Sequence, residues 1–187
     1  MGPVREIVWH SPLLHSLEIF ELGPGGDGGW SLRGLAAVGG SPGHIRYRVE
    51  ADPAWETTLV EIDVAREDDA RTLRLTRDDG GWIVDGSPRP DLRECRDVDL
   101  GWTPATNTLP IRRLGLEVGT SRSIQVAWVR FPEYSVEVSE QTYTRLAVRS
   151  WRYRSGPYDF HLEVDADGLV TRYGAVENGL WRAVAAH

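Results

Sequence analysis

Lysine is missing from this chain of 187 residues, and all 21 of its basic side chains are arginine. The 28 acidic side chains outnumber them, so the formal net charge at pH 7 is −7. An acidic molecule is repelled by the phosphates of nucleic acids and by anionic membrane surfaces. We therefore expect no nucleic-acid partner.

Cysteine is almost missing as well, because Cys95 is the only one. A single cysteine excludes an internal disulfide and a cysteine-based metal cluster. Its acidic neighbours would not activate a thiolate, so we expect a buried small hydrophobe at this position. The five histidines show no metal-ligand spacing, and no motif indicates a cofactor. We expect neither a metal nor a cofactor.

Long hydrophobic runs are missing too. No apolar run approaches the ~20 residues that a membrane-spanning helix needs, so we expect no transmembrane segment. Residues 1–12 lack the apolar core and cleavage site of a secretory signal, which predicts a cytoplasmic protein. The length of 187 residues suits one domain with a single core, and we expect one domain over residues 1–187.

The chain instead contains short segments in which apolar and polar side chains alternate with a period of two. Ile45, Tyr47 and Val49 alternate with Arg46 and Arg48, as in a half-buried strand. Similar segments recur every ~8–12 residues, which is typical of a single antiparallel sheet, a sandwich or a barrel. Acidic-glycine turns at residues 78–81 and 165–168 predict hairpins. The pattern predicts an all-β protein, with a long strand over 143–153 and a short helix near 175–181.

A glycine-rich segment at residues 23–29 invites comparison with a phosphate-binding loop. It lacks the trailing Lys-Ser/Thr pair and the strand-to-helix context of such loops. We therefore expect it to be an ordinary hairpin loop.

The central segment, residues 95–116, is predicted to be a strand, a polar turn and a second strand. Asp97 and Asp99 alternate with apolar residues, and the alternation resumes at Arg112. In that register Arg112 shares a face with the apolar Leu114, while Arg113 points the other way. A buried guanidinium needs a partner, so we expect Arg112 to pair with Asp97 or Asp99.

This central segment also carries a resemblance to a known family. The residues concerned are Asp97-Val-Asp-Leu100, Thr103-Pro-Ala-Thr-Asn-Thr-Leu-Pro-Ile-Arg-Arg-Leu114, Gln141-Thr-Tyr143 and Val164-Asp-Ala-Asp-Gly-Leu-Val170. They are similar to a bacterial family called putative glycolipid-binding, formerly a domain of unknown function. The resemblance implies a strongly curved antiparallel sheet, an open or incomplete β-barrel with at most one or two short helices. That shape is similar to the bacterial lipoprotein carriers, and the implied partner is a lipid or glycolipid-like small molecule.

Eight tryptophans are spread along the chain, so they must gather from many strands. Aromatic side chains either fill a β core or line an apolar cavity. Combining them with the central segment, we expect the ligand-binding residues to be Asp97, Asp99, Trp102, Asn107, Arg112, Trp128 and Tyr143.

Two other classes of function remain open at this point. Asp97 or Asp99 could serve as acid or base in a hydrolase or isomerase that acts on an apolar conjugate, since burial among aromatic residues raises a carboxyl pKa. Alternatively, the open sheet is a structural or partner-binding domain, with a homo-oligomer formed through a sheet edge. No serine, histidine or cysteine motif points to a catalytic residue, so a binding protein is the leading hypothesis.

Overall fold

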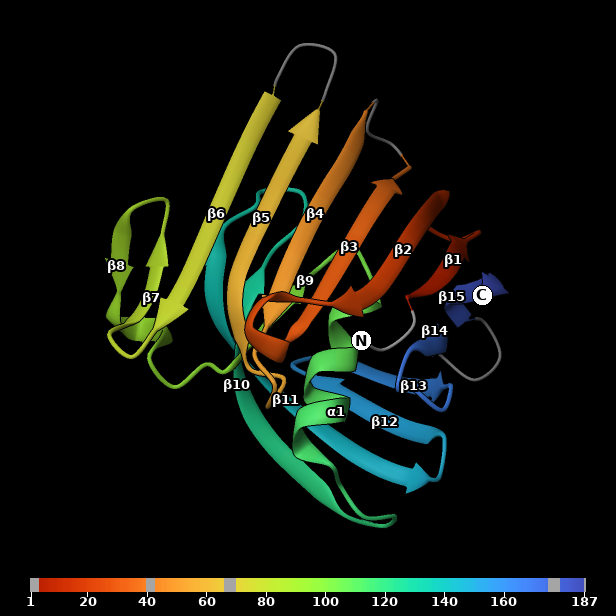
Figure 1. Ribbon diagram of the computed structural model, residues 1–187. Helices are drawn as coiled ribbons and strands as arrows, with labels where there is room; N and C mark the ends of the chain where they lie inside the picture. The colour runs from red at the N-terminus through yellow and green to blue at the C-terminus, as the bar shows by residue number, and fades with distance from the viewer. Residues whose placement is uncertain (1–3, 40–42, 66–69, 175–178, 187) are drawn as a thin grey trace.

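One strongly curved sheet of fifteen strands dominates the computed structural model, which describes residues 4–39, 43–65, 70–174 and 179–186 (Figure 1). The strands follow the order β8-β7-β6-β5-β4-β3-β2-β1-β15-β14-β13-β12-β11-β10-β9. They are β1 Arg5–Ser11, β2 Ser16–Pro24, β3 Trp30–Ala37, β4 His44–Ala51, β5 Thr57–Ala65, β6 Ala70–Asp78, β7 Gly81–Val84, β8 Ser87–Arg89, β9 Asp97–Leu100, β10 Ser121–Val129, β11 Val136–Ala147, β12 Ser150–Ser155, β13 Tyr158–Val164, β14 Val170–Gly174 and β15 Gly179–Ala186. The short helical elements are η1 Gly26–Gly28, η2 Pro90–Leu92, η3 Ala105–Asn107 and α1 Thr108–Leu114.

The alternation in the sequence becomes an alternation of burial. Ile45, Tyr47 and Val49 of β4 are buried, while Arg46 and Arg48 between them are exposed. The predicted all-β fold with an open, curved sheet is confirmed. The glycine-rich segment is confirmed as the loop of the β2–β3 hairpin, where η1 forms.

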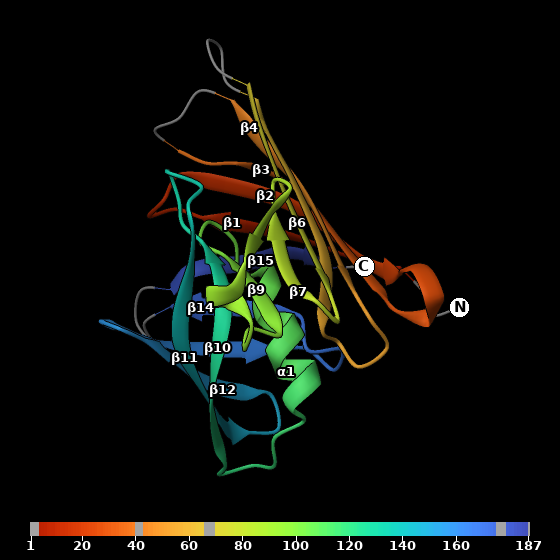
Figure 2. The same cartoon turned by 90° about the vertical axis from the view of Figure 1, so that its left-hand side faces the viewer.

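Curvature brings the two halves of the sheet face to face, and α1 lies between them in both views (Figures 1 and 2). Leu109 of α1 packs into the larger core cluster, to which β1 to β7 contribute. Ile111 of the same helix packs into a smaller cluster formed with β11 to β14. The helix therefore joins the two packing units inside the concave sheet. Among the described residues, no helix has the length and apolarity to span a membrane.

The β9 end of the sheet contacts the beginning of β5 without extending the ladder. Strand β9 pairs in parallel with β10, an exception to the expected antiparallel order. On its other side, the Thr57 N–H donates to the Arg96 carbonyl at 2.9 Å, and the Val98 N–H donates to Thr57 Oγ1 at 3.2 Å. The β8 edge is only three residues long and contains Pro88, which has no N–H to donate. The barrel therefore stays incomplete.

The predicted second strand of the central segment is wrong, because residues 108–114 form the helix α1. Pro110 in the first turn is tolerated, since the first N–H groups of a helix lack partners in any case. Gly115 ends the helix with φ 53°, a left-handed conformation that suits glycine. The apolar alternation of Leu114 and Leu116, from which a strand was predicted, therefore spans the C-terminal end of α1.

Two further expectations about elements need correction. The long strand over 143–153 is split, since β11 ends at Ala147 and β12 begins at Ser150. The joining residues, Val148 and Arg149, carry no glycine, proline or asparagine that would have indicated a turn. The helix near 175–181 falls partly outside the described residues, and Gly179 already belongs to β15.

Candidate functional site

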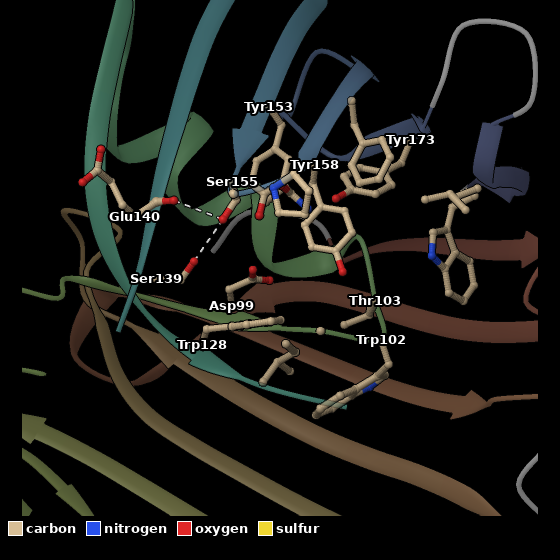
Figure 3. A pocket seen from close by; sticks show the side chains of 18 of the residues that line it. Asp99, Trp102, Thr103, Trp128, Ser139, Glu140, Tyr153, Ser155, Tyr158 and Tyr173 are labelled. Atoms are coloured by element: carbon tan, nitrogen blue, oxygen red, sulfur yellow. Dashed lines mark hydrogen bonds between the residues drawn. The ribbon is translucent and has the colours of Figure 1, made fainter. Parts of the chain in front are cut away.

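A cavity of about 650 Å³ opens between the β12–β14 part of the sheet and the segment that follows β9 (Figure 3). Ligand pockets of small-molecule binding proteins typically span ~300–1,000 Å³. Its lining residues are Leu14, Asp99, Leu100, Gly101, Trp102, Thr103, Asn107, Trp128, Val138, Ser139, Glu140, Tyr153, Ser155, Gly156, Pro157, Tyr158, Phe160, Tyr173, Leu180 and Trp181. The volume of this cavity lies within that range.

Aromatic rings form two opposite walls of this cavity. On one side, Phe160 lies 5.1 Å from Tyr173 and 5.7 Å from Tyr158, measured between ring centroids. On the other side lie Trp102 and Trp128, and Figure 3 shows Asp99 between the two walls. The rings of the first wall contact one another, and the Trp102 ring packs on Tyr134 at 5.7 Å between centroids, so these rings are held in place by their neighbours.

Asp99 is half-buried at the cavity, and its hydrogen-bond partners are neutral. Gln141 Nε2 donates to Oδ2 at 2.6 Å, and Thr106 Oγ1 donates to Oδ1 at 3.3 Å. Among the described residues no arginine or histidine forms an ion pair with this carboxyl group. Burial raises the pKa of Asp99 to about 6, because the charged form loses its hydration.

A chain of side-chain hydrogen bonds extends from Asp99 behind the cavity wall. The Tyr143 hydroxyl donates to Asn107 Oδ1 at 2.9 Å and lies 3.3 Å from Gln141 Oε1. Asn107 Nδ2 donates to the Pro104 carbonyl at 3.1 Å. Gln141 is thereby held with its amide N–H toward Asp99, so the Asp99 carboxyl group has a defined position.

Asp97 has a different environment from Asp99, although only one residue separates them. It is fully buried and accepts a bidentate contact from Arg113, with Nε to Oδ1 at 3.0 Å and Nη2 to Oδ2 at 2.5 Å. Burial raises the pKa of Asp97, and the Arg113 guanidinium opposes that rise. Asp97 is therefore part of a buried ion pair and does not line the cavity.

The expected pairing of Arg112 with a central aspartate is wrong, and Arg113 takes that place. Successive residues of a helix are rotated by ~100°, so the parity argument for a strand does not apply. Arg113 faces β9, whereas the exposed Arg112 places its guanidinium 5.0 Å from the centre of the Trp55 ring. Arg112 borders a separate, smaller hollow.

Glu18 is a second carboxyl group inside the protein, and it was not among the expected site residues. It is fully buried on β2, and one oxygen accepts hydrogen bonds from the Tyr47 and Thr103 hydroxyls, the latter at 2.8 Å. Its Oε2 has no hydrogen-bond partner among the described residues. Burial raises the pKa of Glu18 to about 7. Thr103 lines the cavity, so Glu18 lies directly behind its wall.

The structure brings together most of the expected ligand-binding residues. Asp99, Trp102, Asn107 and Trp128 all line the cavity. Tyr143 stands behind Asn107 and supports it.

The aromatic residues between 153 and 173 were missed as site candidates. Their signal was present in the alternation of Tyr158 and Phe160, which places both rings on one face of β13. Cys95 is buried as expected, and burial raises its pKa to about 11. The described residues contain no cluster of histidine, cysteine, aspartate or glutamate that could hold a metal ion.

Comparison with known proteins yields one family and one solved structure. The family described as Putative glycolipid-binding matches residues 6–178. The crystal structure of a DUF1089 family protein from Pseudomonas aeruginosa is similar, with 27% sequence identity and a TM-score of 0.67. That alignment covers 92% of this chain and 90% of the other. No curated protein matches this chain.

Proposed function

This chain belongs to the Putative glycolipid-binding family, and from that premise we propose that its cavity binds an amphiphile with a sugar-like ring. The observation that carries the proposal is the pair of facing aromatic walls with a carboxyl group between them. The C–H faces of a sugar ring pack on aromatic rings, and a carboxylate accepts hydrogen bonds from sugar hydroxyls. An attached hydrocarbon chain would extend along Leu180 and Val138 of the same lining.

Titration with octyl glucoside below its micelle concentration tests this proposal, with tryptophan fluorescence and calorimetry as the two measurements. We expect saturable binding with one site per chain. Trp128→Ala should weaken binding ~10-fold or more, because it removes half-buried aromatic surface from one wall. Trp30→Ala is the matched control, since Trp30 is also half-buried but stacks on Trp55 outside the cavity lining. If the two variants bind alike, or if nothing binds, the proposal fails.

A second candidate function is supported by the raised pKa of Asp99. A cavity carboxyl group with a pKa of about 6 is suited to act as general acid or base near neutral pH. We propose a hydrolase or isomerase acting on an apolar conjugate as the alternative, with Asp99 as the proton-transferring group. Asp97 is not suited to that role, because Arg113 occupies both of its oxygens. Turnover of a nitrophenyl glycoside that is lost in Asp99→Asn would favour the enzyme over the carrier.

A further inference from the structure

The lining of the cavity carries negative charge without a compensating cation. Asp99 lies inside and Glu140 lies at the exposed rim, and the described lining contains no arginine or histidine. This absence is specific to the cavity, because the chain has 21 arginines in total.

Three arginines that contact residues of the central segment or its neighbouring strands are engaged outside the cavity. Arg113 holds Asp97 with two of its nitrogens. Arg130 lies over the Trp128 ring, 5.3 Å from its centre, and pairs with Glu137 at 3.4 Å. Arg152 pairs with Asp159 on the exposed face of the β12–β13 hairpin. None of these residues belongs to the lining, so an anionic group inside the cavity would have no arginine or histidine of the described lining to pair with.

The hydrogen-bond partners of Asp99 reinforce this asymmetry. Gln141 and Thr106 each give one neutral donor to the carboxyl group, and neither neutralises it. A ligand hydroxyl that approaches Asp99 gains a charge-assisted hydrogen bond. A ligand sulfate, phosphate or carboxylate in the same place meets a like charge in a partly desolvated site, where repulsion is stronger than in water.

We infer that the cavity selects amphiphiles whose head group is uncharged and donates hydrogen bonds, and that it rejects fatty acids and phosphate- or sulfate-bearing head groups. The inference rests on the proposed function and narrows it. The family description names glycolipids without a charge class, whereas the lining distinguishes neutral from acidic ones.

Two probes of equal chain length test the inference on the wild-type protein. Octyl glucoside and octyl sulfate share the same hydrocarbon, and the sulfate stays singly negative at every working pH. At pH 8 and physiological salt we expect the glucoside to bind at least ~10-fold more tightly. Each titration is repeated with Trp128→Ala, and only binding that is weaker in this variant is assigned to the cavity, because Trp128 lines it.

Asp99→Asn provides the residue-level control. This variant should bind octyl sulfate more tightly and octyl glucoside more weakly than the wild type. The ratio of the two dissociation constants should therefore become smaller. Asp63→Asn is the matched control, because it removes the same charge from the exposed face of β5 and should change neither affinity. If Asp99→Asn does not fold by circular dichroism, the wild-type comparison of the two probes still decides.

Each outcome has a definite meaning. Equal or tighter cavity binding of octyl sulfate overturns the inference while the proposed function stands. A preference for octyl glucoside that persists undiminished in a folded Asp99→Asn variant overturns it as well, because the charge of Asp99 would then not be its source. If neither probe binds, the proposed function fails and this inference fails with it.

Discussion

Single residues decide how the two central aspartates differ. Asp97 and Asp99 project from the same face of β9, yet one meets a guanidinium and the other an amide and a hydroxyl. The difference arises from what faces each of them, Arg113 on α1 and Gln141 on β11. The first carboxyl group is locked in an ion pair, and the second remains available to a ligand.

The ion pair predicts unequal effects for the two neighbouring arginines. Arg113→Ala leaves the fully buried Asp97 without its partner, so the free energy of unfolding should fall by ~3–5 kcal/mol. Arg112→Ala removes only an exposed contact with the Trp55 ring, and the loss should be ~0.5–1 kcal/mol. Chemical denaturation of both variants measures the difference. Equal losses would mean that Asp97 finds another partner when Arg113 is absent.

At the scale of elements, the pairing of β3 with β4 places the Tyr47 ring directly over Gly34. Gly34 lies opposite Tyr47, and a Cβ added at Gly34 would lie 2.2 Å from the Tyr47 ring. The missing side chain gives the ring its space, and from there the Tyr47 hydroxyl reaches Glu18. The pairing of two strands thus positions the hydrogen bond to Glu18 behind the cavity.

Gly34→Ala should therefore destabilise the protein by ~1–3 kcal/mol, because the ring must leave its position in a packed core. Gly26→Ala is the control, since a Cβ there meets no atom within 4 Å. Thermal unfolding of the two variants is the measurement. Equal melting temperatures for Gly34→Ala and Gly26→Ala would contradict this prediction, because the Tyr47 ring would then accommodate the added methyl group without loss of stability.

At the scale of the whole molecule, the carboxyl groups without a cationic partner make stability depend on pH. The ordinary pKa of Glu18 is 4.5, and burial raises it to about 7 in the folded state. Between these values the folded protein holds a proton that the unfolded chain has released. The free energy of unfolding therefore falls as pH rises through this window, and it levels off above pH 7. Asp99 acts in the same direction between 3.8 and about 6.

Glu18→Gln should remove the larger part of the decrease in the free energy of unfolding with rising pH. Relative to wild type, the variant should gain ~3 kcal/mol of stability between pH 4.5 and pH 7.5, because its side chain stays neutral throughout. Urea unfolding at several pH values within that range measures the gain. Parallel pH curves for the two proteins would show that Glu18 has an ordinary pKa.

Oligomer formation through a sheet edge stays a prediction, which sedimentation at several concentrations can test.

Local patterns in the chain were sufficient to predict the fold class and part of the site. Period-two alternation has a local cause, since successive side chains of a strand point to opposite faces, and so β4 was predictable. The central motif is also local in the chain, which is why Asp99, Trp102 and Asn107 could be predicted from its residues.

The features that depend on register and on distant partners were decided by tertiary packing. Glu18 points into the core while its apolar neighbours Leu17 and Ile19 are exposed, because the pairing of β2 with β1 and β3 outweighs the preference of single side chains. Arg113 became the partner of Asp97 because packing inside the sheet favoured a helix over a strand. The aromatic wall of β13 meets Trp102 only through the curvature of the whole sheet, and contacts between residues so far apart in the chain leave no local pattern.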